Sequence, residues 1–185
     1  MVSVILTSYN HIRHLPEAVA SIRAQTYKDF EVIAVDDGSK DGSRDWLLGQ
    51  SDLHVVLNEA NVGTYATLNI GIAAAKGKYL AIINDDDLWE PHKLEQQVQL
   101  MDRARYGMVH TYGSFIDESG SAIAGKPLGF AFPQTRSGDI YLDLILSNKL
   151  IASSVLVRSE CFSEVGTFYT EMFCSVDCDI LLRIS

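Results

Sequence analysis

Three consecutive aspartates, Asp85, Asp86 and Asp87, follow an apolar run in the stretch LAIINDDDLWEP, residues 80–91. Crowded carboxylates raise one another's pKa and oppose ionisation, and a cation bound beside them offsets this electrostatic repulsion. Mg²⁺ and Mn²⁺ bind one or two carboxylates together with phosphate oxygens and waters. The cluster therefore predicts a divalent metal site. A solvated acidic turn before a helix starting at Pro91 is the alternative, because acids favour helix N-termini. In an extended segment Asp85 and Asp87 would share a side.

A second acidic cluster, DDGSKDGS, begins at Asp36 and Asp37. Counted from Asp37 it starts like a calcium loop, but the twelfth position, which needs a glutamate, is Leu48. An EF-hand is therefore excluded. A turn that presents Asp36 to a ligand is the functional interpretation. A plain strand-to-helix turn, rich in Asp, Gly and Ser for conformational reasons, stays open.

Apolar runs of strand length alternate with segments of helical period along the first hundred residues. We expect strands at 2–6, 30–35, 53–58 and 79–84 and helices at 15–25, 43–50, 64–75 (closed by Gly77) and 91–104. The strands are continuously apolar, which is typical of a parallel sheet buried on both faces. This order predicts an α/β fold with a Rossmann-like, mostly parallel central sheet flanked by helices. Polar clusters at 7–10, 36–39 and 84–87 then meet at the carboxyl edge, where open α/β sheets bind ligands.

The pattern loosens after residue 105, so we divide the chain into halves of one domain at 1–105 and 106–185. In the second half we expect 107–117 and 122–125 to pair as strands, a helix at 140–148 and a strand at 153–158. The chain stops at Ser185 inside a helix-like pattern, so we expect a C-terminal truncation.

Composition excludes several classes of protein. The formal charge is -9, from 24 acidic and 15 basic residues, so nucleic acid is a poor partner. The phosphate motifs GxxxxGK[ST] and GxGxxG are absent. Three cysteines, Cys161, Cys174 and Cys178, do not form a disulfide framework. No signal peptide and no transmembrane run is visible, so we expect a cytoplasmic location, at most peripheral to the inner face of the membrane.

Five segments in register resemble family 2 glycosyltransferases of the GT-A fold. They are VSVILTSYN, FEVIAVDDGSKDGS, NVGTYATLNIGIAAAKGKYLAIINDDDLWEP, SSVLVRSECFSEVGTF and VDCDILLRI. The resemblance spans nearly the whole chain. It implies an inverting transfer of a sugar from a nucleotide-diphosphate donor, commonly UDP-linked, to a hydroxyl of a glycan or lipid-linked acceptor in cell-surface polysaccharide synthesis. Residues 1–105 would then be the nucleotide-sugar-binding half and 106–185 the acceptor and catalytic half.

The resemblance also assigns roles at the first two strand ends. Thr7 and Tyr9 lie where the family holds the nucleobase, with Tyr9 against its face. Asp36 matches the acid that hydrogen-bonds the base, and Asp37 lies beside it at the nucleoside.

At the end of the strand expected at 79–84, and again near the end of the chain, the resemblance assigns the residues of the reaction centre. Asp85 and Asp86 match the metal-and-ribose motif called DXD, with Asp86 as the direct ligand of Mn²⁺ or Mg²⁺. Asp177 matches the catalytic base, although a helix cap is the alternative for an acid at this position.

Three positions depart from the family pattern: Leu68 replaces a common arginine, Val176 the acid before the base, and Asn84 the first acid of D-x-D-D. Val176 and the early stop at Ser185 keep open a nucleotide-sugar-binding module with impaired catalysis. A nucleotidyltransferase would need a glycine-rich loop after the first strand, and TSYNHIRHLPE contains no glycine. A non-catalytic scaffold would leave the three acid clusters unexplained.

Overall fold

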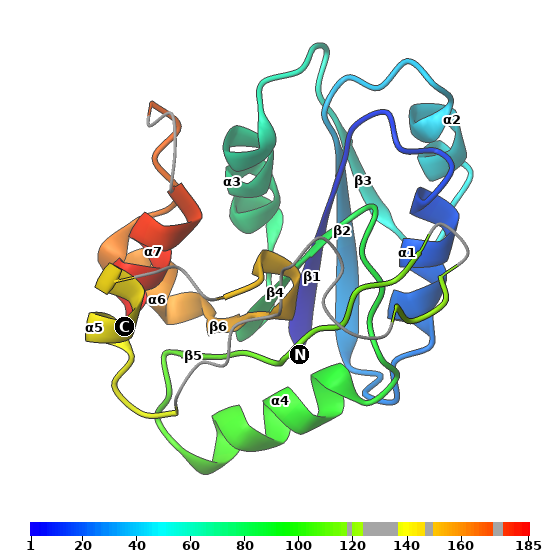
Figure 1. The fold of residues 1–185 in the computed structure, drawn as a ribbon. Coiled ribbons are helices and arrows are strands. Elements are labelled where there is room, and N and C mark those ends of the chain that lie inside the picture. Colours follow the sequence, from blue (N-terminus) through cyan, green and yellow to red (C-terminus); the bar gives the residue numbers. More distant parts are fainter. Residues whose placement is uncertain (118–119, 124–136, 147–149, 172–175) are drawn as a thin grey trace.

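The computed structural model describes residues 1–117, 120–123, 137–146, 150–171 and 176–185. A six-stranded sheet forms its centre, in the order β3-β2-β1-β4-β6-β5 (Figure 1). The strands are β1 (Val2–Ser8), β2 (Phe30–Asp36), β3 (His54–Leu57), β4 (Tyr79–Asn84), β5 (Met108–Val109) and β6 (Leu156–Arg158). The first four are parallel, and β6 runs antiparallel to β4 and β5. The predicted α/β fold with a mostly parallel sheet is confirmed.

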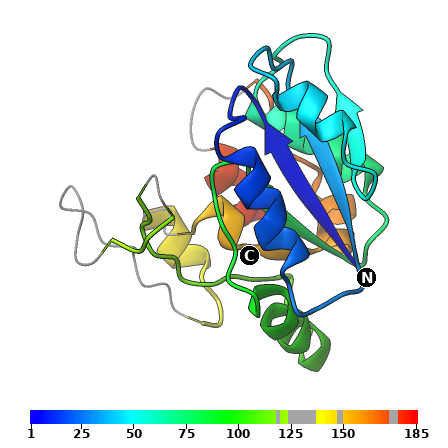
Figure 2. The ribbon, with the colours of Figure 1, turned by 90° about the vertical axis from the view of Figure 1, so that its right-hand side faces the viewer.

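Helices cover both faces of the sheet. They are α1 (Leu15–Arg23), α2 (Ser43–Leu48), α3 (Thr64–Ala74), α4 (Lys93–Arg103), α5 (Tyr141–Leu146), α6 (Ser159–Val165) and α7 (Val176–Ile184), with a 3₁₀ turn η2 (Ala152–Ser154). In Figure 1, α3, α6 and α7 lie to one side of the sheet and α1 and α2 to the other. Figure 2 looks onto the face that α1 and α2 cover.

The side chains of β1 contribute alternately to two hydrophobic cores, one on each face of the sheet, because successive side chains of a strand point to opposite faces. Val4 and Leu6 are fully buried in one cluster with side chains of α1, α2 and α4. Ile5 between them is buried in the other cluster, with side chains of α3, α5, α6 and α7. The sheet is therefore covered on both faces, which explains the continuously apolar strands.

Strand register places the polar clusters at one edge. Thr7 of β1 lies opposite Asn84 of β4, and Ser8 lies opposite Asp36 of β2. All three strands end within a residue or two of these pairs. The loops that follow β1, β2 and β4 therefore leave the sheet side by side at its carboxyl edge.

The second half differs from the prediction in detail. Only Met108–Val109 of segment 107–117 forms a strand, and it pairs with β6. Within the described residues, the expected pairing with 122–125 takes the form of an isolated antiparallel bridge between Ile116 and Ala122. The start of 153–158 is the 3₁₀ turn η2, so β6 is shorter than expected. Cys174, residues 124 and 125, and residues 147 and 148 of the predicted helix lie outside the described residues.

The two halves are joined by specific contacts as well as by the sheet. The Asn69 side chain on α3 donates to the Phe168 carbonyl at 2.8 Å and accepts from the Phe168 amide at 3.0 Å. Tyr65, one turn earlier on α3, stacks on the Phe168 ring at 5.6 Å between centroids. In the described part of the chain, no helix has the length and apolar character that a membrane crossing needs.

Candidate functional site

A cavity of about 350 Å³ opens at the carboxyl edge of the sheet. It is lined by Thr7, Ser8, Tyr9, His11, Asp37, Thr64, Thr67, Asn84, Asp85 and Asp86. These residues come from the ends of β1, β2 and β4 and from the first turn of α3. The three predicted polar clusters therefore do meet, as the parallel sheet requires.

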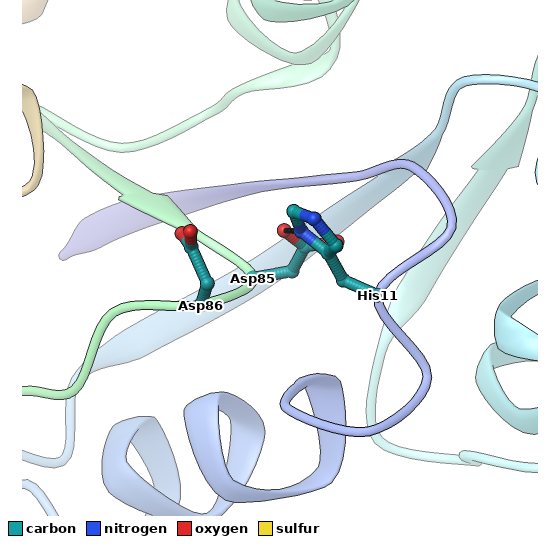
Figure 3. A group of neighbouring side chains, drawn as sticks. All are labelled: His11, Asp85 and Asp86. Atoms are coloured by element: carbon teal, nitrogen blue, oxygen red, sulfur yellow. Dashed lines mark hydrogen bonds and ion pairs between the residues drawn. The ribbon is translucent and has the colours of Figure 1, made fainter. Parts of the chain in front are cut away.

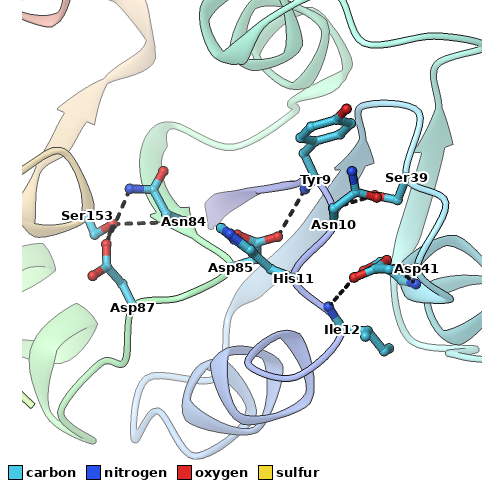
Figure 4. A network of polar contacts seen from close by, with 11 residues as sticks. Tyr9, Asn10, His11, Ile12, Ser39, Asp41, Asn84, Asp85, Asp87 and Ser153 are labelled. Atoms are coloured by element: carbon cyan, nitrogen blue, oxygen red, sulfur yellow. Dashed lines mark hydrogen bonds and ion pairs between the residues drawn. The ribbon is translucent and has the colours of Figure 1, made fainter. Parts of the chain in front are cut away.

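A sharp turn after β1 sets the directions of Tyr9 and His11. Asn10 between them has a positive φ of 55°, a left-handed conformation that asparagine tolerates better than most residues. Its amide donates to Ser39 Oγ at 3.0 Å, and its Oδ1 accepts from the Lys40 amide at 2.8 Å. The turn is thus anchored to the loop after β2, and the Tyr9 side chain remains 45% exposed (Figure 4).

Asp85 is buried and has both carboxylate oxygens engaged. Oδ2 accepts from the Tyr9 amide at 3.0 Å, and Oδ1 lies 2.7 Å from Nδ1 of His11. The hydrogen bond to Asp85 is the main cause that raises the pKa of His11, against a smaller opposing effect of burial. The loop after β1 is therefore fixed to the loop after β4 through this one carboxylate (Figure 4).

Asp87 turns away from Asp85, contrary to the expectation for an extended segment. Residues 84–87 form a turn in which the Asp87 amide donates to the Asn84 carbonyl at 3.2 Å. Asp87 Oδ2 accepts from Ser153 Oγ at 2.5 Å and from Asn84 Nδ2 at 3.3 Å. Burial is the main cause that raises the pKa of Asp87. This aspartate thus links the acidic turn to η2 in the second half.

Asp86 stays exposed beside the cavity, close to the pair formed by His11 and Asp85. Within the described residues, these three side chains each offer a donor atom within 4.8 Å of the others (Figure 3). Two carboxylates and an imidazole form a set of oxygen and nitrogen donors that first-row divalent metals accept. The residues present therefore fit a divalent cation.

Asp36 and Asp37 have different surroundings. Asp36 is fully buried and is not among the residues that line the cavity, and its Oδ1 accepts from the Ser39 amide at 3.1 Å. Among the buried atoms of the described residues, Asp36 Oδ2 and Ser8 Oγ have no hydrogen-bond partner. Asp37 lines the cavity, and its carboxylate accepts from Asn58 Nδ2, the Val62 amide and the Gly63 amide at 2.8–3.0 Å. Asp37 therefore also holds the loop between β3 and α3.

Asp177 is half-buried at the second position of α7 and is not among the residues that line the cavity. It lies close to Tyr65 at the start of α3, and its charge adds to burial in raising the pKa of Tyr65. Two of the departures from the family pattern are core residues: Leu68 and Val176 are at most 3% exposed. Leu68 therefore offers no contact to a ligand in the cavity.

Two site residues were missed by the sequence analysis. His11 follows the Tyr-Asn pair after β1, and its place beside two aspartates of the same sheet edge was the signal that could have found it. Ser153 gave no signal, since its role depends on the folding of η2 against the turn at 84–87.

The fold and the site define an α/β protein with a ligand cavity at the carboxyl edge of its sheet. Residues 3–144 match the model of glycosyl transferase family 2, and the chain belongs to that family.

Relatives and solved structures agree with this assignment. An uncharacterized glycosyltransferase of Rickettsia typhi is 31% identical over all of this chain and 59% of its own length. WfgD of Escherichia coli, a UDP-Glc:alpha-D-GlcNAc-diphosphoundecaprenol beta-1,3-glucosyltransferase, is 32% identical over 72% of this chain and 52% of its own length. The chain thus spans little more than half of each of these relatives.

Two solved structures show the same fold. TarS 1–349 of S. aureus in complex with UDP superposes with a TM-score of 0.77 at 19% identity, over 97% of this chain and 53% of TarS. The mannosyltransferase PcManGT of Pyrobaculum calidifontis, in complex with GDP-Man and Mn²⁺, gives a TM-score of 0.70 at 23% identity, over 99% of this chain and 51% of its own. The fold is therefore that of the GT-A glycosyltransferases.

Proposed function

We propose that this chain is the donor-binding and catalytic part of an inverting glycosyltransferase that uses a UDP-sugar and a divalent metal ion. The acceptor is a hydroxyl of a glycan or of a lipid-linked glycan in cell-surface polysaccharide synthesis. The observation that carries the proposal is the cavity at the carboxyl edge, where an exposed tyrosine, three threonines and the exposed Asp86 lie together. WfgD, whose printed activity uses UDP-Glc and a diphosphoundecaprenol acceptor, supports the choice of donor and acceptor.

The nucleoside would bind at the β1 and β2 side of this cavity. Tyr9 is exposed and rises from a turn that is fixed on both sides, so its ring is available to stack on a base. Thr7 and Asp37 line the same cavity and offer oxygen acceptors. Asp36 Oδ2, buried and unpartnered among the described residues, could accept from the base only if the turn at residues 36–39 opens. The assignment of Asp36 to the base stays a prediction.

Transfer itself needs a base for the acceptor hydroxyl and no covalent intermediate. The acceptor oxygen attacks the anomeric carbon while the bond to the nucleoside diphosphate breaks on the opposite side, so the configuration inverts. Asp177 takes the proton of the attacking hydroxyl as general base. Asp177 lies at the start of α7 and close to the first turn of α3. The same turn of α3 brings Thr64 and Thr67 to the cavity.

Asp86 would hold the metal ion, with the neighbouring donors of His11 and Asp85 beside it. When bound, the ion supplies positive charge that offsets the charge gained by the leaving diphosphate. This role agrees with PcManGT, which was solved with GDP-Man and Mn²⁺.

A thermal-shift titration with UDP, in the presence and absence of Mn²⁺, tests the proposal. A ligand that binds only the folded state raises the apparent stability, by about 2.7 kcal/mol at a hundredfold excess over its Kd. We expect stabilisation by UDP that requires Mn²⁺ and is lost in Asp86→Ala, while Asp45→Ala, an exposed aspartate on α2, behaves like the wild type. Binding of UDP to Asp86→Ala with unchanged Mn²⁺ dependence would contradict the metal assignment.

The alternative of a binding module with impaired catalysis is favoured by one observation. Val176, which stands where the family carries an acid, is fully buried in the core and cannot assist Asp177. A single-turnover reaction with the full-length protein separates the two functions, since a binding module would bind the donor without transferring its sugar.

A further inference from the structure

We propose that His11 is a second protein ligand of the divalent cation, that Asp85 orients the His11 ring instead of binding the ion, and that the nitrogen ligand gives the site a preference for Mn²⁺ over Mg²⁺. The inference rests on the proposed function, because it concerns the same metal ion. It assigns a role to the histidine that follows β1 and separates the roles of the two neighbouring aspartates.

The hydrogen bonds of Asp85 leave one ring nitrogen of His11 free to bind an ion. Asp85 is 5% exposed, and its two oxygens are engaged by the Tyr9 amide at 3.0 Å and by His11 Nδ1 at 2.7 Å. When an ionised carboxylate accepts from Nδ1–H, the other ring nitrogen, Nε2, carries the free lone pair. A metal-binding histidine almost always donates its second ring N–H to such a partner. The pair is thus arranged as an orienting carboxylate and its histidine ligand.

Asp86 supplies the other donor of the pair. Each of His11, Asp85 and Asp86 offers one donor atom that lies within 4.8 Å of the other two. Two ligands at about 2.1 Å from one ion can be separated by at most about 4.2 Å. His11 and Asp86 are both exposed, so their side chains have room to adjust to this separation around an ion. In Figure 3 the two residues approach from separate loops, after β1 and after β4.

The ligand types determine the preference. Mg²⁺ binds carboxylates, phosphates and water, whereas imidazole suits the transition metals. Affinity for mixed nitrogen and oxygen sites rises along the first-row series from Mn²⁺ onward. A site with one imidazole and one carboxylate therefore discriminates against Mg²⁺, and a site with carboxylates alone would accept both ions.

Pulsed electron paramagnetic resonance of the Mn²⁺-loaded protein with UDP tests the ligand directly, because a coordinated imidazole nitrogen modulates the electron spin echo. We expect a nitrogen modulation in the wild type, its loss in His11→Ala, and its retention in His92→Ala, a control at an exposed histidine before α4. The Kd for Mn²⁺, from the signal of the free ion, should rise by on the order of tenfold or more in His11→Ala. The Kd for Mg²⁺, from competition, should change less.

The outcomes separate the inference from the proposed function. A wild type without nitrogen modulation, or a modulation that survives in His11→Ala, would overturn the role of His11, while UDP binding that needs Mn²⁺ and Asp86 would still support the function. Asp85→Asn retains one oxygen for two donors, so it should weaken Mn²⁺ binding about 10- to 100-fold and keep the nitrogen modulation at saturation. If Asp85→Asn abolishes Mn²⁺ binding, Asp85 is a ligand and the orienting role is wrong.

Discussion

Replacement of Asp37 by asparagine should destabilise the protein more than its single-atom change suggests. The Asp37 carboxylate is 3% exposed and accepts three hydrogen bonds, two at Oδ1 from Asn58 Nδ2 and the Val62 amide and one at Oδ2 from the Gly63 amide. An asparagine has one acceptor oxygen. If that oxygen keeps the two bonds at the Oδ1 position, the new NH₂ group faces the Gly63 N–H, which then retains only its second acceptor, Asn61 Oδ1 at 3.1 Å.

The magnitude follows from these contacts. A lost hydrogen bond whose donor keeps another acceptor costs about 1 kcal/mol, and each of the two remaining bonds loses about 1 kcal/mol when its acceptor is no longer charged. The expected loss is therefore about 3 kcal/mol. For a chain of 185 residues, each kcal/mol lowers Tm by about 2–4 °C, so Asp37→Asn should melt about 6–12 °C below the wild type.

Thermal unfolding followed by far-ultraviolet circular dichroism measures this difference. Asp45→Asn is the matched control, because Asp45 is an exposed aspartate on α2 and a surface substitution stays within about 0.5 kcal/mol. A Tm for Asp37→Asn that equals the Tm of this control would refute the view that the carboxylate fastens the loop at 58–63.

Three further substitutions test other parts of the molecule. Tyr9→Ala should raise the Kd for UDP about tenfold, since stacking of a base on an aromatic ring contributes about 1–3 kcal/mol; an unchanged Kd in calorimetry would show that the base binds elsewhere. Asp177→Asn should keep the UDP affinity and lower the rate of transfer by about 10²–10⁴, and a normal turnover would move the general base to another residue. Burial lowers the pKa of Lys93 to about 7. The unfolded chain therefore holds this proton up to about pH 10.4 while the folded chain releases it near pH 7, so stability should rise with pH between these values. Lys93→Met should flatten that rise in urea unfolding at pH 7 and pH 9, and an unaltered rise would exclude Lys93 as its source.

The first half of the fold could be predicted from the sequence because local and global signals agree there. The apolar run at 79–84 is bounded by a glycine and a lysine before it and by aspartates after it, and it forms β4 over the same residues. In the second half the alternation at 107–117 suggested a long strand, but only Met108–Val109 find partners in β6. Strand pairing at that edge depends on a segment almost fifty residues away in the sequence, and a local pattern of residues carries no information about such a distant partner.

The candidate site was predictable to the level of its sheet edge. Parallel strands end on the same side, so the convergence of 7–10, 36–39 and 84–87 followed from the order of elements. Individual contacts did not follow. The contact between His11 and Asp85 joins residues 74 positions apart and depends on the left-handed turn at Asn10. The separate direction of Asp87 depends on Ser153, which the sequence gave no reason to place there.

The position of β6 between β4 and β5 determines which residues a stable, shortened form of the protein must retain. Tyr79–Ala81 of β4 take their outer backbone partners from Arg158–Leu156, which belong to the second half. A fragment ending at residue 105 would leave this side of β4 as an open edge, with unpaired amides and carbonyls beside an apolar surface. Such edges template intermolecular pairing and aggregation. A soluble minimal version of the protein must therefore keep β6, even if only its nucleotide site is wanted.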